Sequence, residues 1–304
     1  MPLSIDRLIN VLVTLTLIEM MVAIGLSVTL TDLVGVARNW GLLARAALSN
    51  YVLVPAVTAV LLVLFRPHPM VCVGFLILAA CPGAPYGPPF AAIAKGNVPV
   101  AVGLMAILAG SSAILAPLLL LYLLPLVSEN EMLSVDAGKI VRTLLFTQLL
   151  PLCFGIALRQ WRPPLADRLQ KPAISLSKLL NITVVGLILF AQFRLLADIR
   201  PRGWMGMLAL LVSSWIVGWP LGGSDGVVRR TMTLTTSMRN VGVGLVIASG
   251  AFPGTAAVTA TLAYGLFAVI GSLVLAKVWG QRPVPGDRMA VLSADLPNEC
   301  PTRP

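Results

Sequence analysis

The sequence has 304 residues, of which 58% are hydrophobic and only 11% are charged, and its mean hydropathy is +0.92. Soluble domains carry about 25% charged residues, so this composition excludes the soluble globular class and indicates an integral membrane protein. A formal net charge of +10 would suggest a nucleic-acid partner in a soluble chain. Here most Lys and Arg residues lie between apolar runs, where they set membrane topology, so we expect a bilayer and no nucleic acid as partner.

Apolar runs of the length that crosses a bilayer, about 20 helical residues, predict nine spans. They are placed at residues 8–30, 42–65, 71–94, 98–126, 140–158, 173–195, 204–222, 228–250 and 255–279. The first run is too long for a cleavable signal peptide, so we expect it to remain as a span. The segment 280–304 is rich in Pro and polar residues and is expected to be a disordered cytoplasmic tail.

Nine spans would place the two termini on opposite sides of the membrane. With the C-terminus inside, most Lys and Arg residues between spans fall on the cytoplasmic side, and the acidic loop containing Glu129, Glu131 and Asp136 falls outside. The positive-inside rule therefore predicts an outside N-terminus and a cytoplasmic C-terminus, against which Arg7 is a mild objection. The expected location is the plasma membrane, which is the inner membrane in a Gram-negative bacterium.

The third predicted span contains the segment Cys81-Pro-Gly-Ala-Pro-Tyr-Gly-Pro-Pro-Phe90. Each proline removes a helix donor and clashes with the preceding turn, so the helix is predicted to break here. The residues assigned to the break are Pro82, Pro85, Gly87 and Pro88. Backbone groups freed inside a membrane need partners, so the break is typical of a binding site.

The eighth span has its own predicted interruption in the segment Thr233–Gly244, where Gly242 is assigned to the break. Each interrupted span is followed by a long apolar helix. This recurrence predicts an inverted repeat with four spans in residues 1–127 and five in residues 138–279, the fifth span having no counterpart.

Arg239 is a cation inside the eighth predicted span. A guanidinium keeps its charge in proteins, and an isolated one near the bilayer centre costs about 3 kcal/mol or more. We therefore expect it to face a cavity, a counter-ion or an anionic substrate. The alternative is that it lies near the helix end and snorkels to the interface beside Arg229 and Arg230.

Glu19 is a carboxylate within the first predicted span. Three interpretations stay open: a salt bridge with Arg239, a proton-coupling group, or a protonated acid that is hydrogen-bonded inside the bundle. The other candidates are small polar residues near the breaks, among which amides are favoured because they both donate and accept. The candidate substrate-binding residues are Arg239, Asn240, Asn50, Tyr86, Thr235, Thr236 and Ser237, with Thr147 and Gln148 as a looser addition.

No enzyme chemistry is indicated. His68 is the single histidine, which excludes a His-based triad and a histidine metal cluster. The cysteines (Cys72, Cys81, Cys153 and Cys300) lack metal-type spacing, and the first three are interpreted as small core hydrophobes. We expect no metal site and no cofactor, although sodium as a coupling ion is considered below.

Taken together, five short segments resemble the bile acid:sodium symporter family. They are Gly25-Leu-Ser-Val-Thr-Leu30, Cys81-Pro-Gly83, Ala94-Lys-Gly-Asn97, Ile114-Leu-Ala-Pro-Leu118 and Ser237-Met-Arg-Asn240. The resemblance covers nearly the whole chain. It implies an inverted-repeat transporter fold with a panel domain and a core domain, in which two broken helices cross near mid-membrane. It also implies the nine-span form, which lacks the family's first helix.

The departures from the family pattern concern sodium. Where sodium-coupled members carry a Ser-Asn pair and further hydroxyl ligands, this sequence has Gly87 and Pro88, and Ala101 and Met105. The family's Glu and Gln ligands align with Thr235 and Arg239, whereas Asn50 and Asn240 are kept in kind. Sodium ligands are thus mostly missing. Our hypothesis is that Arg239 takes over the electrostatic role of bound sodium.

The predicted function is a secondary transporter that moves a small organic anion by alternating access, with sodium coupling in doubt. The alternatives are a sodium:organic anion symporter with a rebuilt ion site, a metalloid or oxyanion exporter, and a membrane receptor that does not transport. The sequence does not assign an oligomeric state.

Overall fold

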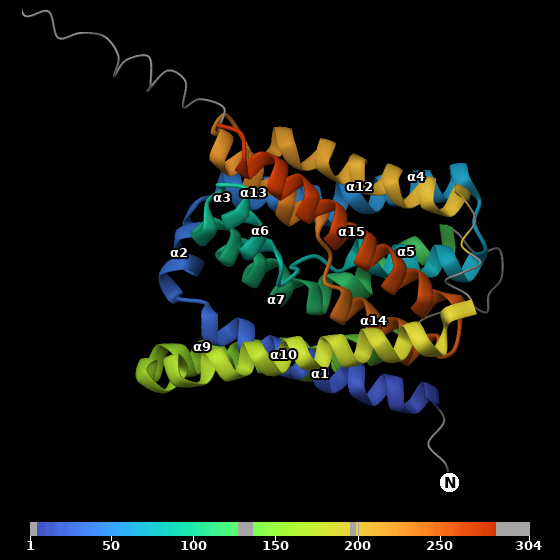
Figure 1. Ribbon diagram of the computed structural model, residues 1–304, viewed down its shortest axis with the longest axis horizontal. Coiled ribbons are helices and arrows are strands. Elements are labelled where there is room, and N and C mark those ends of the chain that lie inside the picture. The colour runs from blue at the N-terminus through green and yellow to red at the C-terminus, as the bar shows by residue number, and fades with distance from the viewer. Residues whose placement is uncertain (1–4, 127–135, 195–198, 200, 284–304) are drawn as a thin grey trace, which may run out of the picture.

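The computed structural model describes residues 5–126, 136–194, 199 and 201–283 (Figure 1). This part of the chain is helical and contains no strand, which confirms the all-α prediction. Among these residues, seven helical stretches are long and apolar enough to cross a membrane. They are Ile5–Ser27 (α1), Trp40–Phe65, Val98–Leu126, Ala137–Trp161, Pro163–Ala191 (α10), Pro201–Leu221 (α12) and Ala256–Gly280 (α15).

Two further membrane segments are interrupted, as the sequence predicts. The first consists of α5 (Pro69–Ala80) and α6 (Gly87–Ile93), and the second of α13 (Gly226–Ser237) and α14 (Val241–Ala251). A helical stretch therefore lies at each of the nine predicted positions. That all nine cross the membrane, and in which direction, remains a prediction.

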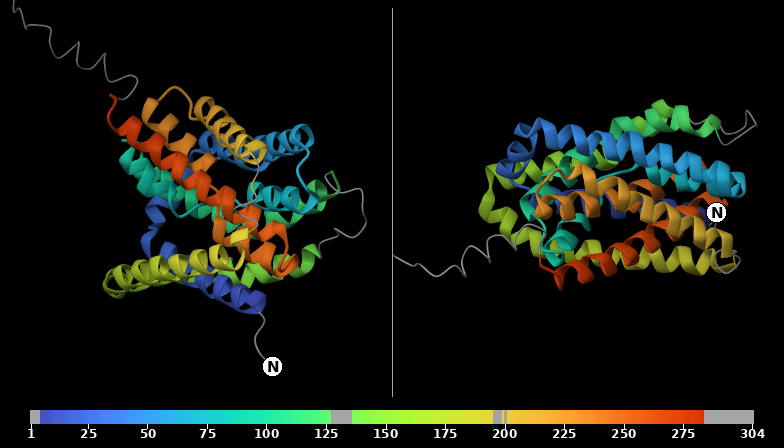
Figure 2. Two further views of the ribbon diagram at one scale, coloured as in Figure 1. Left: turned by 45° about the vertical axis from the view of Figure 1, so that its right-hand side comes forward. Right: turned by 90° about the horizontal axis from the view of Figure 1, so that it is seen from above.

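The helices form two layers (Figures 1 and 2). In one layer α1 packs along both α9 (Leu150–Trp161) and α10. The other layer contains α4 (Val54–Phe65), α5, α6, α7 (Val98–Leu123) and α12 to α15, and α2 (Leu30–Arg38) runs between the layers to pack on α7. This division matches the panel and core that the family resemblance implies. The layer of α1, α9 and α10 is called the panel layer below, and the other layer is called the core layer. The division cuts across the predicted halves, because α1 comes from the first and α9 and α10 from the second.

The panel layer is held by a close backbone approach of α1 and α9. A Cβ atom added to Gly25 would lie 2.5 Å from the carbonyl oxygen of Leu152 and 2.8 Å from the Cα of Gly155. Neither glycine has room for a side chain. Small residues allow this kind of contact between membrane helices, where dispersion forces replace the hydrophobic effect. The two helices therefore pack as one unit.

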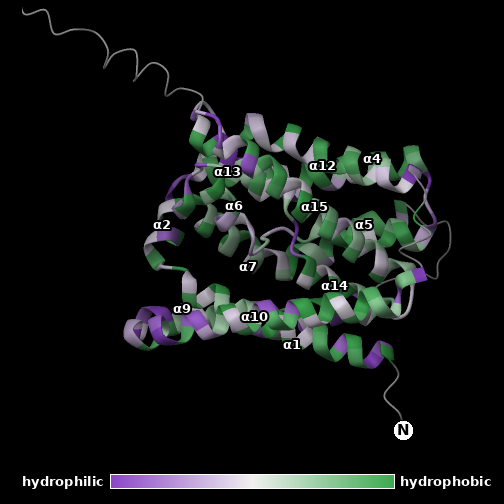
Figure 3. Cartoon of the chain, viewed as in Figure 1, coloured by the Kyte–Doolittle hydropathy of each residue, from purple (hydrophilic) through white to green (hydrophobic). Residues whose placement is uncertain are grey.

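Most residues of the helices are hydrophobic (Figure 3), and many of the large hydrophobic side chains are exposed. Hydrophilic residues gather where α9 meets α10 and where α13 begins, at the left of the view. This distribution suits an apolar slab crossed along the helix axes.

In the part of the chain that the structure describes, two helical segments are wound as π-helix, namely Leu48–Leu53 before α4 and Leu145–Leu149 before α9. Each is followed within two residues by a proline, Pro55 or Pro151, whose missing N–H shifts the hydrogen-bond ladder. The π segments turn Asn50 and Gln148 inward, and both are buried. Gln148 reaches α7, where its Nε2 donates to the carbonyl oxygen of Ala109 and, at 2.9 Å, to Oγ of Ser112.

Several boundaries differ from the prediction. The breaks are shorter than predicted, because Gly87 and Pro88 lie in the first turn of α6 and Gly242 lies in the first turn of α14. Proline suits the first turn of a helix, where its missing N–H would have no partner anyway. For the same reason α10 begins at Pro163 rather than near residue 173, and it continues through Pro172.

The prediction that three of the cysteines lie in the core is correct for two of them. Cys72 and Cys81 are buried, but Cys153 is exposed on α9, so its assignment to the core was wrong. An apolar surrounding sequence marks a lipid-facing position as readily as a core position, which explains the error. Of the predicted tail 280–304, residue 280 is the last of α15 (Ala256–Gly280), and residues 284–304 lie outside the described residues, as do the acidic residues Glu129 and Glu131.

Arg230, on α13, donates hydrogen bonds to carbonyl groups at the C-terminal ends of two helices. Its side chain is only 2% exposed. Nη1 donates to the carbonyl oxygens of Ala94 and Trp279, each at 2.9 Å, and Nη2 donates to those of Arg282 at 3.3 Å and Pro283 at 2.7 Å. These carbonyls end α6 and α15, where a cation also complements the helix dipole.

We expect Arg230→Gln to destabilise the protein by about 3 kcal/mol, because hydrogen bonds to a buried charge are lost and carbonyl groups are left without partners. The measurement is the apparent melting temperature in detergent. Arg282→Gln is the matched control, since it removes the same charge from an exposed side chain. Equal melting temperatures for the two variants would contradict this role of Arg230.

Candidate functional site

The two interrupted helices cross at their breaks, residues Cys81–Tyr86 and Met238–Asn240. Asn240 joins them. Its backbone N–H donates to the carbonyl oxygen of Cys81 at 2.8 Å, and its Nδ2 donates to that of Gly83 at 3.2 Å. Its Oδ1 accepts from the N–H of Val243 at 3.2 Å and so caps α14. Backbone groups freed by one break are thus satisfied by the other, as a low-dielectric environment demands.

The first break is also pressed against α7. Gly83 has a φ of +84°, in the left-handed region. A Cβ atom at this position would lie 2.4 Å from the backbone nitrogen of Ala109. Glycine is required here both for its backbone conformation and for the close approach of α7.

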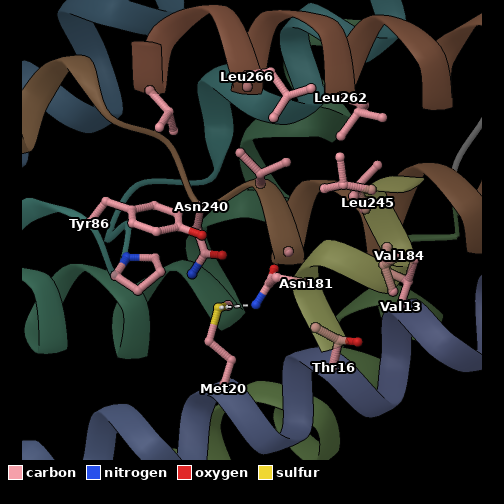
Figure 4. Close-up of a pocket in the computed structure, with 16 residues that line it drawn as sticks. Val13, Thr16, Met20, Tyr86, Asn181, Val184, Asn240, Leu245, Leu262 and Leu266 are labelled. Atoms are coloured by element: carbon pink, nitrogen blue, oxygen red, sulfur yellow. Dashed lines mark hydrogen bonds between the residues drawn. The ribbon is translucent and has the colours of Figure 1, made fainter. Parts of the chain in front are cut away.

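A cavity of about 90 Å³ lies beside the crossing, between the two layers (Figure 4). Side chains from α1, α10, α14 and α15 and from the first break form its walls. The lining residues are Val13, Thr16, Met20, Pro85, Tyr86, Asn181, Val184, Val185, Asn240, Val241, Gly242, Leu245, Leu262, Gly265, Leu266 and Val269. The walls are mostly apolar, none of these residues is charged, and Tyr86, Asn181 and Asn240 bring polar groups to them.

Asn181 is a cavity residue that sequence reasoning missed. It lies on α10, on the opposite side of the cavity from Asn240, and its Nδ2 lies 4.0 Å from the sulfur of Met20 (Figure 4). The same Nδ2 donates to the carbonyl oxygen of Ser177 at 2.8 Å. The available signal was an amide inside a predicted span, the same signal that selected Asn50. Proximity to a break was the criterion used, and Asn181 is distant from both breaks in sequence.

Arg239 is 3% exposed and lies in the second break, at the far end of α13 from Arg229 and Arg230. This position excludes the snorkelling alternative. Its Nη1 donates to the carbonyl oxygen of Asn50 at 3.4 Å and to Asn50 Oδ1 at 3.2 Å. Its Nη2 is buried and has no hydrogen-bond partner among the described residues. The guanidinium points into the core layer and does not line the cavity.

The hydroxyl candidates on α13 also lie away from the cavity. Thr235 Oγ1 donates to the carbonyl oxygen of Thr231 at 2.9 Å, within its own helix. Thr236 is 3.3 Å from Ser49 Oγ, and Ser237 is 3.0 Å from Ser272 Oγ. These buried contacts join neighbouring core helices. Of the predicted substrate-binding residues, the structure brings Tyr86 and Asn240 to the cavity and leaves the others behind its wall.

Glu19 does not pair with Arg239. Its Oε2 accepts a hydrogen bond from Oγ of Ser177, on α10, so the contact lies within the panel layer. Its Oε1 is buried and has no partner among the described residues. Ser177 also accepts through its carbonyl oxygen from Asn181, which connects Glu19 to the cavity wall.

Several residues expected at the sodium positions have other partners or lack a side-chain oxygen. The two oxygens of Asn50 are occupied by Arg239, Ala101 and Met105 bring no side-chain oxygen, and the hydroxyl of Thr235 bonds its own helix. Sodium requires several oxygen ligands without an adjacent positive charge. In the described part of the chain, no group of three or more His, Cys, Asp or Glu residues could hold a metal ion.

A family model described as the Sodium Bile acid symporter family matches residues 14–199. The chain belongs to the sodium bile acid symporter family. Its members are membrane transporters, so the chain is a multi-pass transport protein and not an enzyme.

Two plant proteins are similar to this member of the sodium bile acid symporter family. The probable sodium/metabolite cotransporter BASS1, chloroplastic, of Arabidopsis thaliana is 27% identical over 268 residues, covering 85% of this chain and 64% of that protein. The probable sodium/metabolite cotransporter BASS2, chloroplastic, of Oryza sativa subsp. japonica is 22% identical over 295 residues, covering 94% and 68%. The chain therefore spans 64% and 68% of the lengths of these relatives.

Proposed function

We propose that the chain is a secondary transporter that binds a small organic anion in the cavity beside the helix crossing and moves it by alternating access. The observation that carries the proposal is the place of the cavity between the two layers, with both breaks in its wall. Sliding of one layer against the other would open this cavity to each side in turn. We further propose that the membrane is the plasma membrane, with the N-terminus outside.

The preference for an anion rests on Arg239 and α14. Arg239 adjoins Asn240, which lines the cavity, and α14 begins at the cavity with its positive dipole end. Arg239 satisfies the oxygens of Asn50 as a bound cation would. We propose that it supplies permanently the positive charge that sodium supplies to other family members.

The size of the cavity limits the substrate. One water molecule needs about 10–15 Å³ of such cavity volume, so about 90 Å³ accommodates several waters or one small ligand. This volume suits a small carboxylate in the state described by the structure. A larger substrate, such as a sterol acid, would require the layers to separate.

Uptake into liposomes that contain the purified protein tests the proposal, with external sodium replaced by choline or potassium. The expected result is an unchanged initial rate of uptake for a small carboxylate, because Arg239 stays charged at any physiological pH. Empty liposomes are the control. A strict sodium requirement would overturn the proposal and favour the sodium symporter with a rebuilt ion site.

Proton coupling through Glu19 is a second candidate, because one of its carboxyl oxygens is buried without a partner among the described residues and Ser177 connects it to the cavity wall. An imposed pH gradient in the same liposomes would then drive accumulation of the substrate.

Metalloid export is less favoured, since the thiol of Cys81 is fully buried and thiolate chemistry needs an accessible cysteine.

A further inference from the structure

A second, larger cavity lies away from the helix crossing. Its volume is about 510 Å³, and it lies where the end of α4, the start of α5 and the start of α12 meet, at the right of Figure 1. The lining residues are Thr58, Leu61, Leu62, Phe65, Arg66, Pro67, His68, Val71, Phe75, Ile199, Arg202, Gly203, Gly206 and Leu210. The cavity beside the helix crossing shares none of these residues.

The lining has two chemically distinct parts. Leu61, Phe65, Phe75 and Leu210 belong to a largely hydrocarbon wall, whereas Arg66, Arg202 and His68 place positive or titratable groups at the helix ends. None of the lining residues that the structure describes is acidic. Neither Arg66 nor Arg202 forms an ion pair with a carboxylate of the described residues. The cavity therefore suits a ligand that has an apolar chain and an anionic head.

The surroundings indicate where such a ligand comes from. Val63 and Leu64 on α4 and Met205 on α12 are between 60% and 72% exposed and flank the cavity in sequence. Large apolar side chains that are exposed on membrane helices face lipid. Arg66 and Arg202 lie at helix ends, at the level where headgroups are expected, so the cavity adjoins a leaflet.

We propose that this cavity binds an anionic phospholipid from the adjacent leaflet. The acyl chain occupies the apolar wall, and the phosphate lies between the guanidinium groups of Arg66 and Arg202. Planar guanidinium groups bind phosphate through paired hydrogen bonds. Because Arg66 and Arg202 are both cations, they favour a lipid with a net negative charge over a zwitterionic lipid, whose headgroup carries its own cation. A bound lipid would link α4 to α12 and stabilise that side of the core layer.

Native mass spectrometry of the full chain in detergent tests this site, with dioleoyl phosphatidylglycerol and dioleoyl phosphatidylcholine as probes. The double variant Arg66→Asn with Arg202→Gln should bind phosphatidylglycerol at least about tenfold more weakly than the wild type. Asparagine is chosen at position 66 because the residue there has a φ of +45°, which asparagine tolerates. Phosphatidylcholine binding should change little.

Two comparisons make the test specific. The double variant Lys139→Gln with Arg142→Gln removes the same charge from α8 (Ala137–Leu144), at the same predicted side of the membrane, and should keep wild-type affinity. Gly206→Leu keeps the charge but fills the apolar wall, since a Cβ there would meet Phe65 at an ordinary 3.9 Å. This variant should bind phosphatidylglycerol more weakly than the wild type, whereas any binding of soluble glycerol phosphate should be unaffected.

Three outcomes would overturn the proposal. The first is equal loss of phosphatidylglycerol in both arginine-depleted and control variants, which indicates general surface charge. The second is unchanged lipid binding in Gly206→Leu together with strong binding of glycerol phosphate, which indicates a site for a soluble anion. The third is a lipid-independent dimer that disappears in Gly206→Leu, which assigns the cavity to a second copy of the chain.

Discussion

Replacing Arg239 by glutamine should lower sodium-independent uptake of an organic anion by about tenfold or more. The variant keeps a hydrogen-bond donor near Asn50 but removes the buried positive charge beside the cavity. Interactions of charged groups in such settings contribute about 1.5–3 kcal/mol, and about 1.36 kcal/mol corresponds to a factor of ten. The measurement is the initial uptake rate in liposomes as a function of substrate concentration, which separates KM from the maximal rate.

Thermal unfolding separates this effect from damage to the fold. Arg239 is buried, bonds one residue and faces no carboxylate among the described residues, so its removal relieves a desolvation cost. The melting temperature of Arg239→Gln should therefore equal or exceed that of the wild type. Glu19→Gln serves as the comparison and should leave KM nearly unchanged. Equal increases of KM in both variants would contradict a specific role for Arg239.

Replacing Gly83 by alanine should abolish most transport and lower the melting temperature markedly. The left-handed backbone costs a non-glycine residue about 1–2 kcal/mol. The added Cβ would also lie 2.4 Å from the backbone nitrogen of Ala109, so α7 or the first break must move. Such overpacking adds about 1–3 kcal/mol. The hydrogen bond from Asn240 to the carbonyl oxygen of Gly83 would be displaced with it.

Gly186→Ala is the matched control for Gly83→Ala. Gly186 lies within α10, and a Cβ atom added there would have open space around it, with no neighbouring atom within 4 Å among the described residues. Alanine at this position should leave transport intact and change stability by less than about 1 kcal/mol, in the stabilising direction. If Gly83→Ala behaved like this control, the first break would not depend on close contact with α7.

The sequence predicted features that depend on local chemistry. Prolines act on their own and preceding turns, so the first break could be placed to within a few residues from the sequence between Cys81 and Phe90. The same property misplaced Gly87 and Pro88, because proline both ends one helix and starts the next. Hydropathy located the helical stretches for a similar reason, since bilayer thickness fixes their length.

Features that depend on tertiary packing could not be predicted. The partner of Arg239 is a residue 189 positions away, and only the folded chain shows that Asn50 satisfies it. The hydrogen bonds of Arg230 to the ends of α6 and α15 could not be predicted, because a basic residue near the end of a span is ordinarily interpreted as a determinant of membrane topology. Asn181 reaches the cavity only through the packing of α10 against α1.

Gln148 has a consequence for the proposed transport cycle. Its amide extends from the segment before α9 to Ala109 and Ser112 of α7, and its Oε1 is buried without a partner among the described residues. If the layers slide, both hydrogen bonds must break, at a cost of about 1 kcal/mol each. The residue would then set part of the barrier between the inward-open and outward-open states without touching the substrate. Turnover speed and substrate affinity could consequently evolve independently in this transporter.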